Sequence, residues 1–158
     1  KDPYDALFDL LAEEGCAPAM IDFISDEEDL EGILRAPFSG VISDATYPGA
    51  GLPHPRVYGA FARLLERYVR ERGTLRMEQA VHKVTGQAAK RFALRDKGVI
   101  AVGADADLCL FDLVRETGTY ADPARLAAGM DRVWVNGRLA FAAGRMTGER
   151  AGKTLRRG

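Results

Sequence analysis

The sequence predicts an α/β fold of the barrel type over residues 1–96 and a small all-β unit over residues 97–158. Three observations support this fold class. Helix and strand patterns alternate up to Asp44, a long amphipathic helix follows, and short β-type runs take over near Lys97. Alternating helices and strands imply parallel strands joined by crossovers. In a barrel of such units, the loops after the strands carry the reactive groups.

The first helix is expected to begin after Asp2. A carboxylate caps a helix well, and Pro3 suits the first helical position. Leucines recur at helical spacing until Gly15 ends the pattern. Residues 19–24 are mostly apolar and include Ile and Phe, which predicts a buried strand.

A second helix and a second strand lead to the first candidate site residue. Ser25 and Glu28 have the spacing of a capping box with Ser25 as the cap, and this helix should end before Pro37. Residues 40–43 are the next apolar run and stop at Asp44. Asp44 is therefore predicted to lie at the C-terminal end of a barrel strand.

A strong amphipathic helix is predicted over residues 57–72, where six large apolar residues fall on one helical face. Gly73 should end it, and residues 77–84 and 87–92 are expected to form two shorter helical pieces. These helices form the bridge to the all-β unit.

The all-β unit is predicted from four short runs and one turn. Asn136-Gly137 is a type I′ hairpin signal between the last two runs. Trp134, Phe141 and Cys109 are expected in the core of the unit. The four predicted strands are residues 99–102, 108–111, 132–135 and 138–141.

Composition excludes several classes of function. The 158 residues carry a formal net charge of −1, whereas a nucleic-acid-binding domain usually has a basic patch. The sequence has no apolar run long enough to span a membrane. Cys16 and Cys109 lie far apart without a CxxC partner, which suggests reduced thiols and a cytoplasmic location. Because Lys1 stands directly before a helix in place of an initiator Met, we expect a segment of a longer chain.

Two residues around a Gly/Pro-rich loop are candidates for chemistry on position and type alone. Asp44 follows a predicted strand, where a carboxylate suits acid/base work but is also a common cap of a turn. His54 lies between two prolines and suits either a polarising group or a rigid packing element. His82, within the predicted helix 77–84, is expected to be structural or exposed.

Several phrases of the sequence together resemble one family. They are residues 2–11, Ser43-Asp44, His54-Pro55-Arg56, and residues 58–61, 97–108, 135–137, 144 and 147–148. The chain resembles the C-terminal third of an N-acyl-D-amino-acid deacylase (D-aminoacylase) of the amidohydrolase superfamily, and the resemblance covers essentially the whole chain. The phrase at residues 97–108 indicates only the superfamily. The Ser-Asp and His-Pro-Arg phrases indicate the D-aminoacylase branch.

The resemblance implies a TIM-like (β/α)8 barrel with a small β-sandwich built from both chain ends. Residues 40–43 would then be the last barrel strand, and residues 98–142 would contribute to the sandwich. It also implies a zinc-dependent hydrolase that cleaves the amide bond of N-acyl-D-amino acids. The main zinc ligands would lie outside this chain, because neither His54 nor His82 sits in a ligand motif. We therefore expect this chain alone to be inactive.

The resemblance also implies roles for single residues. Asp44 matches the catalytic acid/base, which takes the proton of the attacking water, and could be a weak metal ligand. Arg56 matches the residue that binds the substrate's α-carboxylate, with an ordinary ion pair as the alternative. His54 would contribute to substrate binding. The family usually has Gly directly after the catalytic Asp, where this chain has Ala45.

Two alternative functions stay open from the sequence alone. One is a hydrolase of cyclic amides, similar to hydantoinases and dihydroorotases, and the other is a non-catalytic structural module. The expected partners are a small-molecule N-acyl amino acid, the N-terminal part of the same polypeptide and, as an open alternative, a second copy in a homo-oligomer. Neither nucleic acid nor a membrane is expected.

Overall fold

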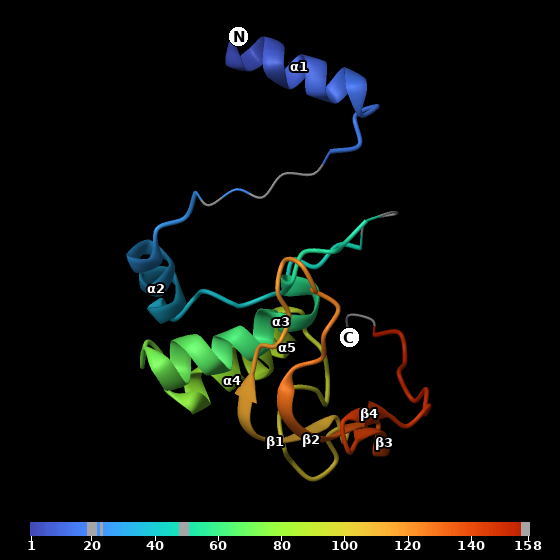
Figure 1. Cartoon of the computed structure of the whole chain (residues 1–158). Helices are drawn as coiled ribbons and strands as arrows, with labels where there is room; N and C mark the ends of the chain where they lie inside the picture. The colour runs from blue at the N-terminus through green and yellow to red at the C-terminus, as the bar shows by residue number, and fades with distance from the viewer. Residues whose placement is uncertain (19–21, 23, 48–50, 156–158) are drawn as a thin grey trace.

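The computed structural model describes residues 1–18, 22, 24–47 and 51–155. Helices come first along the chain and an antiparallel sheet comes last (Figure 1). The helical elements are α1 (Pro3–Glu13), α2 (Glu27–Arg35), α3 (Arg56–Arg63), the π-helix η1 (Leu64–Glu71), α4 (Met77–Val84) and α5 (Gly86–Arg91). The strands are β1 (Leu108–Arg115), β2 (Ala128–Val135), β3 (Arg138–Ala142) and β4 (Arg145–Met146).

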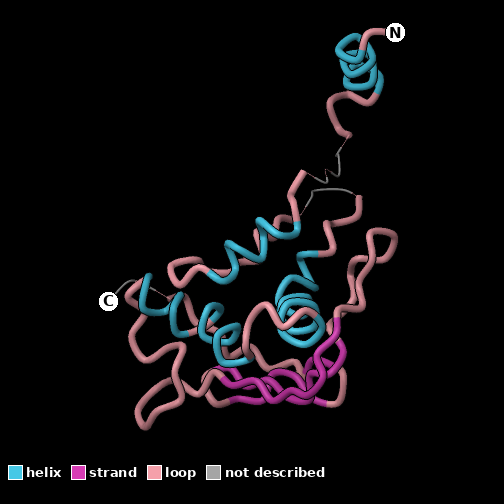
Figure 2. Tube along the Cα trace, turned by 90° about the vertical axis from the view of Figure 1, so that its left-hand side faces the viewer, coloured by secondary structure: helices cyan, strands magenta, loops and turns pink. Residues whose placement is uncertain are grey.

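The first helix forms where its local signals predict it. The Asp2 side chain accepts a hydrogen bond from the Tyr4 amide at 2.8 Å, and Pro3 is the first helical residue. No residue of α1 is buried, and Figures 1 and 2 both show α1 apart from the other helices. The predicted strand 19–24 falls largely outside the described residues.

The cap of α2 differs by one residue from the prediction. Asp26, and not Ser25, accepts the hydrogen bonds of the first helical turn, from the amides of Glu28 at 2.8 Å and Asp29 at 3.4 Å. Both types of side chain are good caps, so a pair of neighbouring candidates leaves the register open by one position.

Residues 40–43, predicted as a barrel strand, form no strand among the described residues. A strand needs a partner for its backbone hydrogen bonds, and no described segment lies in register with this run. Val41 nevertheless packs against the helical core. The predicted order of helix and strand is therefore replaced by a helix followed by a segment without regular secondary structure up to Tyr47.

The predicted helix over residues 57–72 forms, begins one residue earlier and changes its winding at Leu64. The wider π-helical half keeps Leu64 and Tyr68 buried on the inner face. The two pieces predicted at 77–84 and 87–92 correspond to α4 and α5. The helical core consists of Leu34, Leu64, Tyr68, Leu75 and Ala80.

The four-stranded sheet has the order β1-β2-β3-β4, with every neighbouring pair antiparallel. The predicted hairpin forms, because Asn136 and Gly137 both adopt positive φ, at 48° and 75°. Strand β1 is longer than predicted and contacts η1 and α3, so the helices cover one side of the sheet (Figure 2). Strand β4 had no sequence signal.

Two expectations for the all-β unit are wrong. Residues 99–102 form no strand, and their apolar side chains are exposed, Ile100 to 90%. They pair with no strand of the described sheet, so a short run of apolar residues alone does not produce a ladder. Cys109 is exposed rather than part of the core, whereas Phe141 is buried and Trp134 is half-buried.

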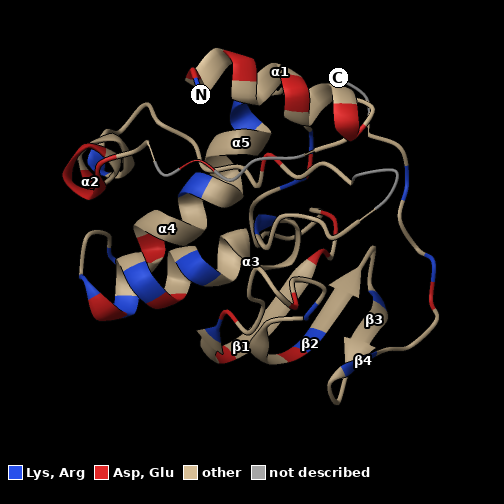
Figure 3. Ribbon diagram, turned by 45° about the horizontal axis from the view of Figure 1, so that its top comes forward, with Lys and Arg blue, Asp and Glu red and all other residues tan. Residues whose placement is uncertain are grey.

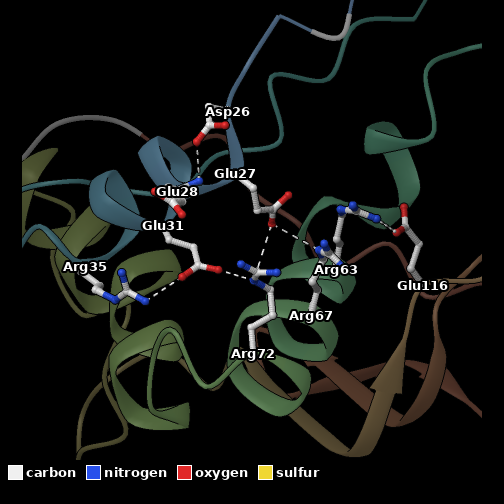
Figure 4. A network of polar contacts seen from close by, with 9 residues as sticks. All are labelled: Asp26, Glu27, Glu28, Glu31, Arg35, Arg63, Arg67, Arg72 and Glu116. Atoms are coloured by element: carbon white, nitrogen blue, oxygen red, sulfur yellow. Dashed lines mark hydrogen bonds and ion pairs between the residues drawn. The ribbon is translucent and has the colours of Figure 1, made fainter.

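A network of ion pairs attaches α2 to the π-helix (Figure 4). Glu27 contacts Arg67 at 3.3 Å and Arg72 at 3.9 Å, and Glu31 contacts Arg72 and, at 2.6 Å, Arg35. Hydrogen bonds from these arginines lower the pKa of both carboxyl groups. Figure 3 shows acidic and basic residues close together on α2 and on the helices that lie beside α4. The network therefore fixes how α2 lies on the helix that begins with Arg56.

Candidate functional site

The structure brings Asp44 and Arg56 together, although twelve positions separate them along the chain. Arg56 Nη2 lies 3.3 Å from Asp44 Oδ2, with side-chain exposures of 41% and 72%. An ion pair this open contributes at most about 1 kcal/mol, so either group can leave the other for a ligand at low cost. Asp44 has φ 47°, a left-handed conformation that Asp tolerates better than most residues, and Ala45 does not share it.

The Arg56 guanidinium has an unused donor. Its Nε atom is buried and has no hydrogen-bond partner among the described residues. Nε and Nη2 form one edge of the planar group, and Nη2 lies 3.3 Å from the Asp44 carboxylate in the ion pair. An edge with one unpaired donor suits a carboxylate, because two parallel N–H groups bind its two oxygens at once.

His54 makes contacts through both ring nitrogens. The Arg56 backbone amide donates to Nδ1 at 3.0 Å, and Nε2 lies 3.3 Å from the Tyr120 hydroxyl oxygen. Because Nδ1 accepts, the neutral ring carries its proton on Nε2. Burial and the positive charge of Arg56 lower the pKa of His54, against an opposite effect of Glu116. The imidazole therefore stays neutral at pH 7.

Tyrosines near the site were not predicted from the sequence. The Tyr120 ring meets the His54 ring edge-on, with centroids 5.2 Å apart. The Tyr47 and Tyr58 hydroxyls form a 2.6 Å hydrogen bond, which raises the pKa of Tyr47. Tyr58 belongs to the amphipathic pattern of its helix, but Tyr120 lies in a loop of small and polar residues where no periodicity marks it.

The segment that leads to Asp44 is attached to α4 and α5. The buried Lys83 ammonium donates to Ala36 O at 2.7 Å, to Ser39 O at 2.8 Å and to Ser39 Oγ at 3.0 Å. Gln87 donates to Ser39 O at 3.0 Å. These contacts fix the backbone five residues before Asp44. His82, on the same helix, is exposed as expected.

The described residues do not form a metal centre of their own. No group of three or more His, Cys, Asp or Glu side chains gathers in this part of the chain. Zinc sites in hydrolases use three protein ligands, so Asp44 could supply at most one of them. Within the same residues, no helix combines the length and the apolar character that crossing a bilayer requires. The cytoplasmic location and the homo-oligomer stay predictions.

Comparison with known proteins gives the site its context. Residues 10–141 match the model of an amidohydrolase family. The chain is 40% identical to an N-acyl-D-aspartate deacylase of Alcaligenes xylosoxydans xylosoxydans over 142 residues, which are 88% of this chain and 28% of the relative. An allantoinase of Solibacter usitatus matches over only 57 residues, 36% of this chain and 12% of the relative, at 49% identity.

Solved structures agree with this family. A D-aminoacylase, described with a binuclear metal centre, matches with TM-score 0.86 and 37% identity over 95% of this chain and 32% of its own. The N-acyl-D-glutamate deacylase of Bordetella bronchiseptica, complexed with zinc and a phosphonate inhibitor, matches with TM-score 0.75 and 36% identity. This match covers 88% of this chain and 32% of the deacylase chain. The chain thus spans about a third or less of the length of these relatives. It belongs to the amidohydrolase family.

Proposed function

We propose that this chain is the C-terminal part of a metal-dependent hydrolase that cleaves the amide bond of N-acyl-D-amino acids. The observation that carries the proposal is the contact between Asp44 and Arg56, a carboxylate and a guanidinium 3.3 Å apart. The match to deacylases along most of the chain supports it. Residues 1–96 would form the last part of a TIM-like barrel, and residues 97–158 a part of a β-sandwich.

Asp44 is the acid/base of the proposed reaction. It takes a proton from the attacking water and passes it to the nitrogen of the leaving amine, for which an exposed carboxylate is suitable. A zinc ion would activate that water and polarise the amide carbonyl. Because the described residues hold no ligand set, its main ligands would come from residues outside this chain.

Arg56 binds the substrate's α-carboxylate in this proposal. The two substrate oxygens would bind Nε and Nη2 once the side chain turns its buried Nε–H toward the ligand, which gives Nε its missing acceptor. Asp44 would leave Nη2 at the same moment, because the substrate carboxylate takes its place. Substrate binding would then release the acid/base from its ion pair at the step that needs it.

The two alternative functions receive less support. The match to an allantoinase covers 36% of this chain, whereas the match to the deacylase covers 88%. A non-catalytic module gives no reason for a carboxylate and a guanidinium that face each other near an unpaired buried donor.

Variants of the enzyme that contains this chain test the proposal. Asp44→Asn should lower kcat for N-acetyl-D-aspartate or N-acetyl-D-glutamate by about 10²–10⁴-fold, the usual share of a general acid/base. Asp131→Asn, at an exposed position of β2, is the matched control and should leave kcat unchanged. Hydrolysis by the Asp44→Asn variant at the control rate would refute the acid/base role.

Arg56→Ala separates carboxylate binding from general damage. It should raise KM for the free acid by roughly 10- to 100-fold, as for a lost charge-assisted hydrogen bond, and leave KM for the corresponding amide nearly unchanged. Equal losses for both substrates would show that Arg56 does not bind the carboxylate.

A further inference from the structure

The loop between β1 and β2 has a defined structure of its own. The Thr119 amide donates to Asp122 O at 3.1 Å, and the Asp122 amide donates to Thr119 Oγ1 at 3.0 Å. Thr117 Oγ1 donates to Leu126 O at 2.8 Å, and Pro123 is fully buried within the loop. A loop with internal hydrogen bonds and a buried centre keeps one conformation. It therefore presents Tyr120, between Thr119 and Asp122, in a fixed place.

The base of this loop is attached to the helix that begins with Arg56. Arg63 contacts the Glu116 carboxylate at 3.2 Å, as Figure 4 shows. The Glu116 amide donates to the Glu66 side chain at 2.8 Å, and Arg70 donates to Val114 O at 2.8 Å. Three successive turns of α3 and η1 thus bind the chain on the sheet side. The loop and the first turn of α3 consequently belong to one rigid unit.

The tip of the loop returns to the start of the same helix. Tyr120 contacts His54 Nε2 at 3.3 Å, and His54 Nδ1 accepts from the Arg56 amide at 3.0 Å. The imidazole therefore lies between the loop and the first residue of α3. A ring bonded at both nitrogens cannot turn without breaking one of the two bonds.

We propose that Tyr120 is a positioning residue of the carboxylate site, which acts through the His54 ring to hold Arg56 where its guanidinium faces Asp44. This inference rests on the proposed function only for the ligand that Arg56 binds. The hydroxyl of Tyr120 keeps the ring in place, the ring accepts from the first amide of α3, and that amide fixes the origin of the Arg56 side chain. The all-β unit thus contributes to the site through Tyr120.

Two histidines make the inference testable by NMR on the 158-residue chain. In ¹⁵N-histidine-labelled protein at pH 7.5, His54 should carry its proton on Nε2, with the lone pair on Nδ1. His82, exposed on α4, gives the second set of ring signals and should be the same in every variant. The groups that face His54 are Arg56, Glu116 and Tyr120. The variants used in these experiments change only Tyr120 among them, so the charges around the ring stay the same. A proton on Nδ1 would overturn the proposal without any mutation.

Tyr120→Phe removes the hydroxyl and keeps the aromatic ring. Hydrogen exchange of the Arg56 amide should accelerate about fivefold, the effect of one hydrogen bond of ordinary strength. Tyr4→Phe, which removes a hydroxyl from the exposed helix α1, should leave that rate unchanged. Equal exchange in wild type and Tyr120→Phe, or equal acceleration in both variants, would overturn the proposal.

The same variant in the enzyme that contains this chain gives a functional readout. Tyr120→Phe should raise KM for an N-acyl-D-amino acid about fivefold and change kcat less than twofold, because it loosens the carboxylate site and not the acid/base. A fall in kcat at constant KM would contradict a positioning role. If the NMR signature is present and no N-acyl amino acid is hydrolysed, the proposed function fails while the contact between loop and helix stands.

Discussion

Lys83 offers the sharpest test of how this fold supports its candidate site. It is 5% exposed, and burial lowers its pKa, so its charged form is costly. It makes three hydrogen bonds to the chain at Ala36 and Ser39, ahead of Asp44. We expect Lys83→Met to destabilise the chain, because Met fills a similar volume but donates no hydrogen bond.

The size of the loss follows from the other donors at these acceptors. Hydrogen bonds to a charged group contribute about 1.5–3 kcal/mol. In the variant, Ala36 O still accepts a hydrogen bond from the Ser39 hydroxyl at 2.9 Å, and Ser39 O still accepts one from Gln87 at 3.0 Å. The variant also avoids the cost of burying an ammonium group. The net loss should therefore be about 1–2 kcal/mol, smaller than the roughly 3–5 kcal/mol of an orphaned buried charge.

Urea unfolding followed by circular dichroism measures this difference, with Lys90→Met on the exposed side of α5 as the control. The double variant Lys83→Met/Gln87→Leu adds a second test. It leaves Ser39 O without its two side-chain donors, so its loss should exceed the sum of the single losses by about 1–3 kcal/mol. Additive losses, or a Lys83→Met loss above about 4 kcal/mol, would refute this account of the segment before Asp44.

Two further predictions concern the neutral histidine and two glycines with positive φ. Because the folded pKa of His54 is lowered, the unfolded chain binds more protons. The contribution of His54 to the free energy of unfolding should be fully present above the pKa of the unfolded chain, near 6.5, and should be lost as the pH falls through the folded pKa. His54→Asn should remove this slope in urea midpoints, and an unchanged slope would exclude His54 as its source. Gly103→Ala should cost about 1–2 kcal/mol from its φ of +89° alone. Gly129→Ala should cost more, because its Cβ would lie 2.7 Å from Leu113 O, and equal Tm values would contradict the close approach.

Local signals predicted the elements that depend on local contacts. The cap at Asp2, the amphipathic helix before Gly73 and the Asn136-Gly137 turn each involve residues a few positions apart, and each forms. The π-helical winding at Leu64 had no such signal. Nor did the burial of Lys83, because nothing nearby in the sequence distinguishes an exposed lysine from one that binds backbone carbonyls 44 and 47 residues away.

The candidate site depends on contacts between residues that are far apart in the sequence. The pattern identified Asp44, His54 and Arg56 by residue type and by resemblance, and the structure brings them together. It expected a barrel strand to carry Asp44, but residues 40–43 have no paired neighbour among the described residues. Their position depends instead on Val41, which packs against the helical core, and on donors from α4 and α5. A strand paired on both sides would not need those donors. If barrel strands of the proposed longer enzyme supply such pairing, Lys83→Met should cost less there than in this chain, and the difference would measure what those strands contribute to the position of Asp44.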